Sequence, residues 1–251
     1  MQILILGGTS EARQLCRALE SRRSHHIIFS LAGVTNSALP VPAETRIGGF
    51  GGVAGLADYL RANRIDAVID ATHPFAAQMS RHAVEATQLC AIKLLRLARP
   101  AWQAPPGARW HHVSTIAQVP AALGEMPRHV FLTTGRKDLA PFMMTPHRYL
   151  LRSIETPHLP LPPHTTLILA RGPFSLDDEI TLMKQHRIDC LVTKNAGSDA
   201  TIAKLEAARL LGLEVIMVDR PALPPAQECA SVEAALDWVE QNPTQGIRRN
   251  V

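Results

Sequence analysis

Aromatic residues are scarce in this sequence, because Phe, Tyr and Trp together make up only 4% of its 251 residues. This scarcity argues against a surface that stacks nucleic-acid bases on aromatic rings. Hydrophobic residues nevertheless account for 46% of the chain, so the core is expected to be aliphatic, as where helices pack on a parallel sheet. The length allows one large domain or two small ones.

Cysteines are few, and none of them forms a CxxC pair or a His/Cys cluster with zinc spacing. The HExxH pattern is absent too, so the sequence predicts no metal site. The four cysteines are expected to be reduced, as in a cytoplasmic protein. They are Cys16, Cys90, Cys190 and Cys229. No apolar run is long enough to span a bilayer, and the chain starts with a strand rather than a signal peptide.

Dense runs of Lys and Arg are also missing, although the formal net charge is +4. This balance argues against a nucleic-acid partner and fits an anionic small-molecule substrate. The nucleophile elbow and the G-x-x-x-x-G-K-[ST] phosphate loop are absent as well. The sequence therefore does not support an ATPase of that class or a serine hydrolase.

Apolar strand-like runs alternate with helix-like segments, and this alternation predicts parallel sheets with helices on both faces. It predicts strands at 2–6, 27–32, 66–71 and 92–97, then an irregular stretch rich in proline, then a second α/β series. We expect two Rossmann-like α/β domains, with the active site in the cleft between them. The predicted boundaries are 1–98 and 113–241 for the domains, 99–112 for the linker and 242–251 for a flexible tail.

The first strand ends in two glycines, and a helix begins directly after them. Gly7 and Gly8 allow a ligand close to the backbone, and the free N–H groups of a helix N-terminus favour phosphate. Thr9, Ser10 and Glu11 complete the turn. It predicts part of a dinucleotide site, although a plain strand-to-helix turn has the same pattern.

The dinucleotide fingerprint G-x-G-x-x-G is incomplete here, and the second strand ends without the acid that holds the ribose of NAD. A cofactor with a 2′-phosphate therefore fits better than NAD. Arg46, or the hydroxyls of Thr35 and Ser37, are the candidate partners of that phosphate.

Four further strand-end loops carry hydroxyl, imidazole or cationic side chains. Thr72 and His73 follow the strand at 66–71; His73 is either an ordinary hydrogen-bonded turn residue, a ligand contact or a proton donor. Arg136, Arg171 and Lys194 each follow a later strand. They cap helices or form surface ion pairs, or they bind anionic groups.

Five sequence blocks, which contain these turns and strand-end loops, together resemble the precorrin-6A reductase family of cobalamin biosynthesis. The blocks are residues 7–12, 70–76, 134–136, 170–174 and 193–197, and the resemblance extends from residue 2 to about residue 240. The stretch 70–76, which reads DATHPFA, is the most specific of them. The last block departs from the family, because Ala196, Gly197 and Ser198 stand where a serine-glycine-glycine form is more usual.

The resemblance implies an NADPH-dependent reductase that reduces one double bond of precorrin-6A to give precorrin-6B, or acts on the cobalt-bearing analogue. We expect residues 7–11, Thr72, His73 and Lys194 to bind NADPH. The tetrapyrrole carboxylates are expected at Gly135, Arg136, Arg171, Lys194 and Ser198. The proton comes from His73, from solvent or from an acidic group of the substrate. A monomer or a homodimer is expected.

Two other classes of protein share part of this pattern. A dehydrogenase of small carbonyl compounds would need a Tyr-x-x-x-Lys pair, but Asn63 follows Tyr59 by four residues and Ser153 follows Tyr149. A non-catalytic module that binds a dinucleotide or a tetrapyrrole would have the same loops. NADPH binding without tetrapyrrole-dependent oxidation would identify that module.

Overall fold

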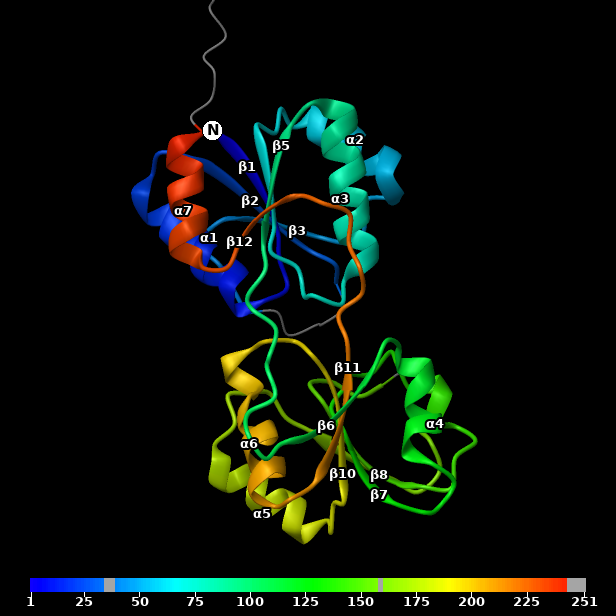
Figure 1. Cartoon of the computed structure of the whole chain (residues 1–251). Helices are drawn as coiled ribbons and strands as arrows, with labels where there is room; N and C mark the ends of the chain where they lie inside the picture. Colours follow the sequence, from blue (N-terminus) through cyan, green and yellow to red (C-terminus); the bar gives the residue numbers. More distant parts are fainter. Residues whose placement is uncertain (34–38, 158–159, 243–251) are drawn as a thin grey trace, which may run out of the picture. The chain divides into compact units, whose positions relative to one another are not determined.

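The computed structural model describes residues 1–33, 39–157 and 160–242 and divides into two compact units (Figure 1). The first unit contains Met1–Pro100 and the chain from Ala222 onward, and the second contains Ala101–Pro221. Each is built on a sheet of six parallel strands, counted over the described residues. The predicted fold class, two Rossmann-like α/β domains, is confirmed. The predicted cleft between the domains stays a prediction.

The first sheet has the strand order β3-β2-β1-β4-β5-β12. Its strands are β3 (Glu44–Ile47), β2 (His26–Leu31), β1 (Gln2–Leu6), β4 (Ala67–Asp70), β5 (Lys93–Leu97) and β12 (Gln227–Cys229). The direction in which successive strands are added reverses between β1 and β4. In open α/β sheets, ligands bind outside the carboxyl ends of the strands at such a reversal.

Helices cover both faces of this sheet (Figure 1). They are α1 (Ser10–Arg22) and α7 (Val232–Gln241) on one face, with α2 (Gly52–Ala62) and α3 (Ala77–Cys90) on the other. Because side chains alternate along a strand, Ile3 and Ile5 pack with α1 and α7, while Leu4 and Leu6 pack with α2. No helix in the described part of the chain is long and apolar enough to cross a membrane.

The second sheet has the order β9-β8-β7-β10-β11-β6 and reverses between β7 and β10. Its strands are β9 (Thr165–Leu169), β8 (Arg148–Ser153), β7 (His129–Leu132), β10 (Cys190–Lys194), β11 (Glu214–Val218) and β6 (Arg109–Val113). The helices α5 (Leu176–Gln185) and α6 (Ala203–Leu210) pack on one face, and α4 (Val119–Leu123) lies on the other. Three 3₁₀ turns complete this unit: η1 (Ile116–Gln118), η2 (Ala140–Phe142) and η3 (Asp199–Thr201).

The domain boundaries differ from the predicted ones at both ends of the second unit. β12 pairs in parallel with β5, and α7 buries Leu236 and Trp238 against the first sheet, so the end of the described chain belongs to the first unit. The predicted linker 99–112 contains most of β6 and the buried Trp102, so it belongs largely to the second unit. Asn242, from the predicted tail, caps α7 and accepts a 2.8 Å hydrogen bond from Lys93.

Three strands lie where the sequence predicts loops. These are β3, β6 and β12, and each is the edge strand of its sheet. The sequence also predicts a short helix at about 137–143, and the structure has only the turn η2 within this segment.

Candidate functional site

The turn after β1 places two glycines where the strand order of the first sheet reverses. The Gly7 N–H donates a 2.8 Å hydrogen bond to the Ser30 carbonyl, and a Cβ atom on Gly7 would lie 2.5 Å from the Phe29 ring. Gly8 has a φ of +135°, and a Cβ atom there would meet nothing within 4 Å. Glycine at position 7 permits the close packing of Phe29, and glycine at position 8 keeps the backbone accessible to a ligand. The turn therefore fits a dinucleotide phosphate at the N-terminus of α1.

Thr9 holds the turn after β1 against the turn after β4. Its hydroxyl caps α1 by accepting a 3.1 Å hydrogen bond from the Ala12 N–H, and it donates a 2.9 Å bond to the Ala71 carbonyl. Both capacities of this buried hydroxyl are therefore used inside the protein. In the structure, the Thr9 hydroxyl therefore fixes the two turns relative to each other.

Ser10 and Glu11 meet a cation that the sequence analysis missed. One carboxylate oxygen of Glu11 accepts a 3.1 Å hydrogen bond from the Ser10 hydroxyl and a 2.6 Å bond from the Arg99 guanidinium. Arg99 is largely buried and follows β5. This ion pair therefore ties the start of α1 to the carboxyl end of a second strand.

Arg46 on β3 lies beside Ser30, its register partner at the carboxyl end of β2. Its guanidinium donates a 3.1 Å hydrogen bond to the Ser30 hydroxyl and 2.8 Å bonds to the carbonyls of Gly48 and Gly49. It also stacks on Phe50, 3.8 Å from the ring centroid. The guanidinium therefore occupies the region where an acid would hold the ribose of NAD. Thr35 and Ser37 lie outside the described residues.

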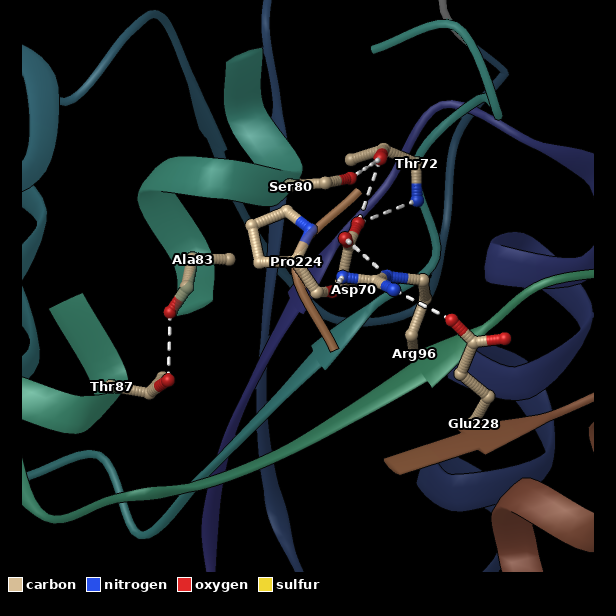
Figure 2. Close-up of polar contacts among 8 residues, drawn as sticks. All are labelled: Asp70, Thr72, Ser80, Ala83, Thr87, Arg96, Pro224 and Glu228. Atoms are coloured by element: carbon tan, nitrogen blue, oxygen red, sulfur yellow. Dashed lines mark hydrogen bonds and ion pairs between the residues drawn. The ribbon is translucent and has the colours of Figure 1, made fainter. Parts of the chain in front are cut away.

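A buried ion pair lies at the carboxyl end of β4, directly before the turn, as Figure 2 shows. Asp70 and Arg96 are register partners on β4 and β5, with exposed fractions of 2% and 5%. The Arg96 Nε lies 3.8 Å from Asp70 Oδ2, and the guanidinium also donates a 2.6 Å bond to Glu228 and a 3.0 Å bond to the Pro224 carbonyl. Arg96 therefore joins β4 to the segment that returns from the second unit.

The same Asp70 orients Thr72, one of the predicted cofactor residues. Asp70 Oδ1 accepts a 2.7 Å hydrogen bond from the Thr72 hydroxyl and a 3.2 Å bond from its N–H (Figure 2). Ser80 on α3 lies 3.4 Å from the same hydroxyl. Because Asp70 is held by Arg96, the position of Thr72 depends on an ion pair that the sequence analysis did not single out.

His73 is half-buried in the turn that leads to α3. Its Nδ1 accepts a 3.2 Å hydrogen bond from the Phe75 N–H, and its carbonyl accepts a 2.7 Å bond from the Ala76 N–H. The Phe75 ring lies 5.8 Å from the imidazole, measured between centroids. Because Nδ1 accepts, the neutral ring carries its proton on Nε2. The turn therefore leaves Nε2 as the donating atom of His73.

The second unit places two cations at the reversal between β7 and β10. Arg136 follows Gly135, whose φ is +92°, and forms a 3.1 Å ion pair with Glu155. Lys194 ends β10 and forms a 2.5 Å ion pair with Asp138. Both side chains are mostly buried, so each ion pair is partly shielded from water.

The other two predicted substrate residues of this unit lie differently. Ser198 follows β10 and is the N-cap residue of η3, where its carbonyl accepts a 3.2 Å hydrogen bond from the Thr201 N–H. Arg171 is exposed and follows β9, an edge strand two positions from β7. The structure thus brings Gly135, Arg136, Lys194 and Ser198 to one reversal point but places Arg171 at the edge of the sheet.

A buried cationic cluster lies at the carboxyl end of β7, and the sequence analysis missed it. Lys204 on α6 is 4% exposed and donates a 3.0 Å hydrogen bond to the Thr133 hydroxyl. Its ammonium lies 5.5 Å from the Trp102 ring centroid. Arg152 forms a buried 2.8 Å ion pair with Glu179 nearby. Burial, together with the charge of Arg152, lowers the pKa of Lys204 to about 7, while Glu179 acts in the opposite direction.

The lowered pKa of Lys204 predicts a pH-dependent stability. Between pH 7 and the ordinary lysine value of 10.5, the unfolded chain holds a proton at Lys204 that the folded chain releases. The free energy of unfolding should therefore rise with pH across this interval, by up to about 1.4 kcal/mol per pH unit from this group. Lys204→Met should flatten that rise, whereas the exposed Lys184→Met should not. Urea unfolding of the three proteins from pH 7 to 10 measures the slopes, and parallel curves for wild type and Lys204→Met would contradict the assignment.

Within the described ranges, no group of three or more His, Cys, Asp or Glu side chains is arranged to hold a metal ion. Most of the site residues that the structure describes instead gather at the two strand-order reversals, one in each sheet, while Arg46 and Arg171 lie at edge strands. Asp70, Arg96, Arg99 and Lys204 are the polar residues that sequence reasoning did not find. The sequence signal of Asp70 and Arg96 is a charge inside an apolar strand segment, whereas Arg99 follows β5 and Lys204 lies in a helix with other charged residues.

Comparison with known proteins supports the family resemblance over the whole fold. The family model described as precorrin-6x reductase CbiJ/CobK matches residues 2–240. A precorrin-6A reductase from Rhodococcus erythropolis is 48% identical, over 95% of this chain and 97% of that protein. A cobalt-precorrin-6A reductase from Priestia megaterium is 30% identical, over 88% and 91% of the two chains.

A solved structure named CobK precorrin-6A reductase superposes with a TM-score of 0.91 and 45% identity, and the match covers 96% of this chain and 97% of the other. The family match, the same fold and the near-complete coverage therefore agree with one another. The chain belongs to the precorrin-6x reductase family.

Proposed function

We propose that this protein reduces one double bond of the precorrin-6A macrocycle with NADPH, giving precorrin-6B in cobalamin biosynthesis. The observation that carries the proposal is the family match over residues 2–240, which includes every predicted site residue. The chain's mild positive charge suits a substrate that carries many carboxylates.

The identities of the relatives favour a substrate without cobalt. Relatives named precorrin-6A reductase share 43–48% identity with this chain, whereas those named cobalt-precorrin-6A reductase share 26–30%. We infer that precorrin-6A is the preferred substrate and that the cobalt-bearing analogue is reduced more slowly.

The first unit offers groups for each charged part of NADPH. The open backbone at Gly8 and the N-terminus of α1 suit the pyrophosphate. Arg46, beside Ser30 at the ends of β2 and β3, suits the 2′-phosphate. A guanidinium stacked on a ring and held by two carbonyls loses little conformational freedom when it binds an anion.

Arg46→Gln tests the choice between NADPH and NADH. We expect kcat/KM with NADPH to fall by about 10- to 100-fold, because a hydrogen-bonded ionic contact is lost. The value with NADH should stay unchanged, since NADH has no 2′-phosphate. Arg61→Gln, which removes an exposed arginine from α2 of the same unit, is the control. An equal fall with both cofactors would show instead that Arg46 supports the turn.

The turn after β4 would act on the reaction itself. NADPH, when bound, supplies the hydride, and the protein orients the reactants and excludes water. Thr72, fixed by Asp70, would contact the cofactor, and His73 would provide the proton from Nε2. This assignment gives the chain one residue for orientation and one for proton transfer at a single turn.

The cations of the second unit would bind the carboxylates of the tetrapyrrole. Arg136 and Lys194 each already hold one carboxylate, and Arg171 adds an exposed guanidinium after β9. Arginine and lysine pair strongly with carboxylates where water is partly excluded. We place Gly135 and Ser198 beside these cations because they follow the same two strands.

The absorbance of NADPH in the presence and absence of precorrin-6A tests the proposed function. We expect loss of the NADPH band only when the tetrapyrrole is present, and a slower loss with the cobalt-bearing analogue. Oxidation of NADPH by small carbonyl compounds instead would favour a different oxidoreductase. Binding of NADPH with no substrate-dependent oxidation would favour a non-catalytic module.

A further inference from the structure

The second unit has a surface pocket at the amino-terminal ends of its strands, opposite to the carboxyl-end loops described above. This basic pocket has a volume of about 370 Å³. His129 and Arg148 are the first residues of β7 and β8, His164 directly precedes β9, and His186 and Arg187 follow α5. These positions mark the amino-terminal ends of the strands. The basic pocket is therefore separate from the carboxyl-end loops that we assign to the reductase reaction.

The ionisable Arg and His side chains that line the basic pocket are all basic. Five of its ten residues are Arg or His, and none of the ten is Asp or Glu. Protein surfaces usually intersperse charges of both signs, so a concave region lined by one sign raises the local concentration of counter-ions. The volume lies within the range of small-molecule sites, which is about 300–1,000 Å³.

The nearest acidic side chains are already paired outside this lining. Asp189 follows the lining residue Ile188, but its carboxylate accepts a 3.2 Å hydrogen bond from the Arg128 guanidinium and a 3.0 Å bond from the His129 N–H. Glu214 accepts a 2.8 Å bond from the same arginine. Arg128 therefore pairs with both carboxylates, and neither of them belongs to the lining of the basic pocket.

The end of α5 would repel an anion if its carbonyls pointed freely at the pocket. The carbonyls of Met183 and Lys184 accept hydrogen bonds from the Ile188 and Arg187 N–H groups, at 2.9 and 3.1 Å. The His186 carbonyl accepts a 3.1 Å bond from His129 Nδ1. These carbonyls at the C-terminal end of α5 thus accept hydrogen bonds within the protein. The bond from Nδ1 to the His186 carbonyl also orients the His129 ring.

We propose that the basic pocket binds a small molecule with two or more negative charges, carried by phosphate groups or by clustered carboxylates. Arg148 and Arg187 are exposed guanidinium groups, which pair with both kinds of anion. The three histidines supply further N–H donors. This inference is independent of the proposed function, because no residue of the basic pocket belongs to the reductase site.

Calorimetric titration with pyrophosphate and with citrate tests the proposal and separates the two sources of charge. NADPH is present at saturation so that the turn after β1 does not take up the probe. The test variant is Arg148→Gln with Arg187→Gln. The matched control is Arg23→Gln with Arg64→Gln, which removes two exposed arginines from helix ends of the first unit.

We expect one or both probes to bind the wild type, and the test variant to bind at least about tenfold more weakly. The control variant should bind like the wild type. Equal weakening in both variants would show that the loss of net positive charge alone weakens binding, which would contradict a specific pocket. Unchanged binding in the test variant would also overturn the proposal. Hydrogen exchange of the wild type adds a measurement without mutation, because a bound probe should protect the amides of residues 185–188. Absence of protection there would also overturn the proposal.

Discussion

Replacing Arg96 with Met is expected to lower the free energy of unfolding of the first unit by about 3–5 kcal/mol, the usual cost of leaving one partner of a buried ion pair alone. Asp70 is 2% exposed, and the cation beside its Oδ2 is Arg96. The same substitution removes the hydrogen bonds to Glu228 and to the Pro224 carbonyl. The large effect follows because one guanidinium balances the buried charge of Asp70 on β4 and donates hydrogen bonds to Glu228 on β12 and to the Pro224 carbonyl.

Two variants separate the buried contact from the exposed one. Glu228→Gln removes a partner that is 54% exposed and should cost no more than about 1 kcal/mol. Asp70→Asn combined with Arg96→Met should recover part of the loss, because it removes the buried charge that Arg96→Met leaves behind.

Hydrogen exchange of the amides of β4, β5 and β12 measures this stability in the first unit alone, so unfolding of the second unit does not interfere. A loss smaller than 1 kcal/mol for Arg96→Met would mean that water reaches Asp70 and compensates its charge. If Glu228→Gln lowered the free energy of unfolding as much as Arg96→Met does, the important contact would be the exposed one between Arg96 and Glu228.

The interior strands could be predicted from the sequence, and the edge strands mostly could not. An interior strand is buried on both faces and reads as an apolar run, as in Ile3–Leu6 of β1. β3, β6 and β12 each pair on one side only, and their sequences ETRI, RWHHV and QEC carry exposed or charged residues. They are strands because a neighbour provides the hydrogen bonds, and that neighbour is not visible in the local pattern.

The strand-end loops could also be predicted, because glycines and hydroxyls mark them locally. What holds these loops could not be predicted, since it depends on residues distant in the sequence. The Thr9 bond to the Ala71 carbonyl joins residues 62 positions apart, and the Arg96 bond to Glu228 spans 132. The predicted end of the second domain at residue 241 fails for the same reason, because the sixth strand of the first sheet arrives only after the second unit is complete.

The largest expected effect on activity is that of His73. If its Nε2 delivers the proton that accompanies the hydride, His73→Ala should lower kcat by about 10²- to 10⁴-fold while the KM for NADPH stays the same. The Phe75 N–H bond to Nδ1 fixes the orientation of the ring. Proton delivery from Nε2 requires the doubly protonated ring, so Nδ1 must give up its bond from the Phe75 N–H when it takes up the second proton.

Addition of imidazole distinguishes proton transfer from support of the turn. Free imidazole should restore part of the turnover of His73→Ala, because it replaces the missing acid in the space that the side chain vacates. It should not affect His26→Ala, which removes an exposed histidine at the amino-terminal end of β2. His73→Gln keeps a hydrogen-bond donor but no acid, so it should remain as slow as His73→Ala. Wild-type turnover in His73→Ala would instead assign the proton to solvent or to a carboxylic acid group of the substrate, and the role of His73 would then be limited to the geometry of the turn.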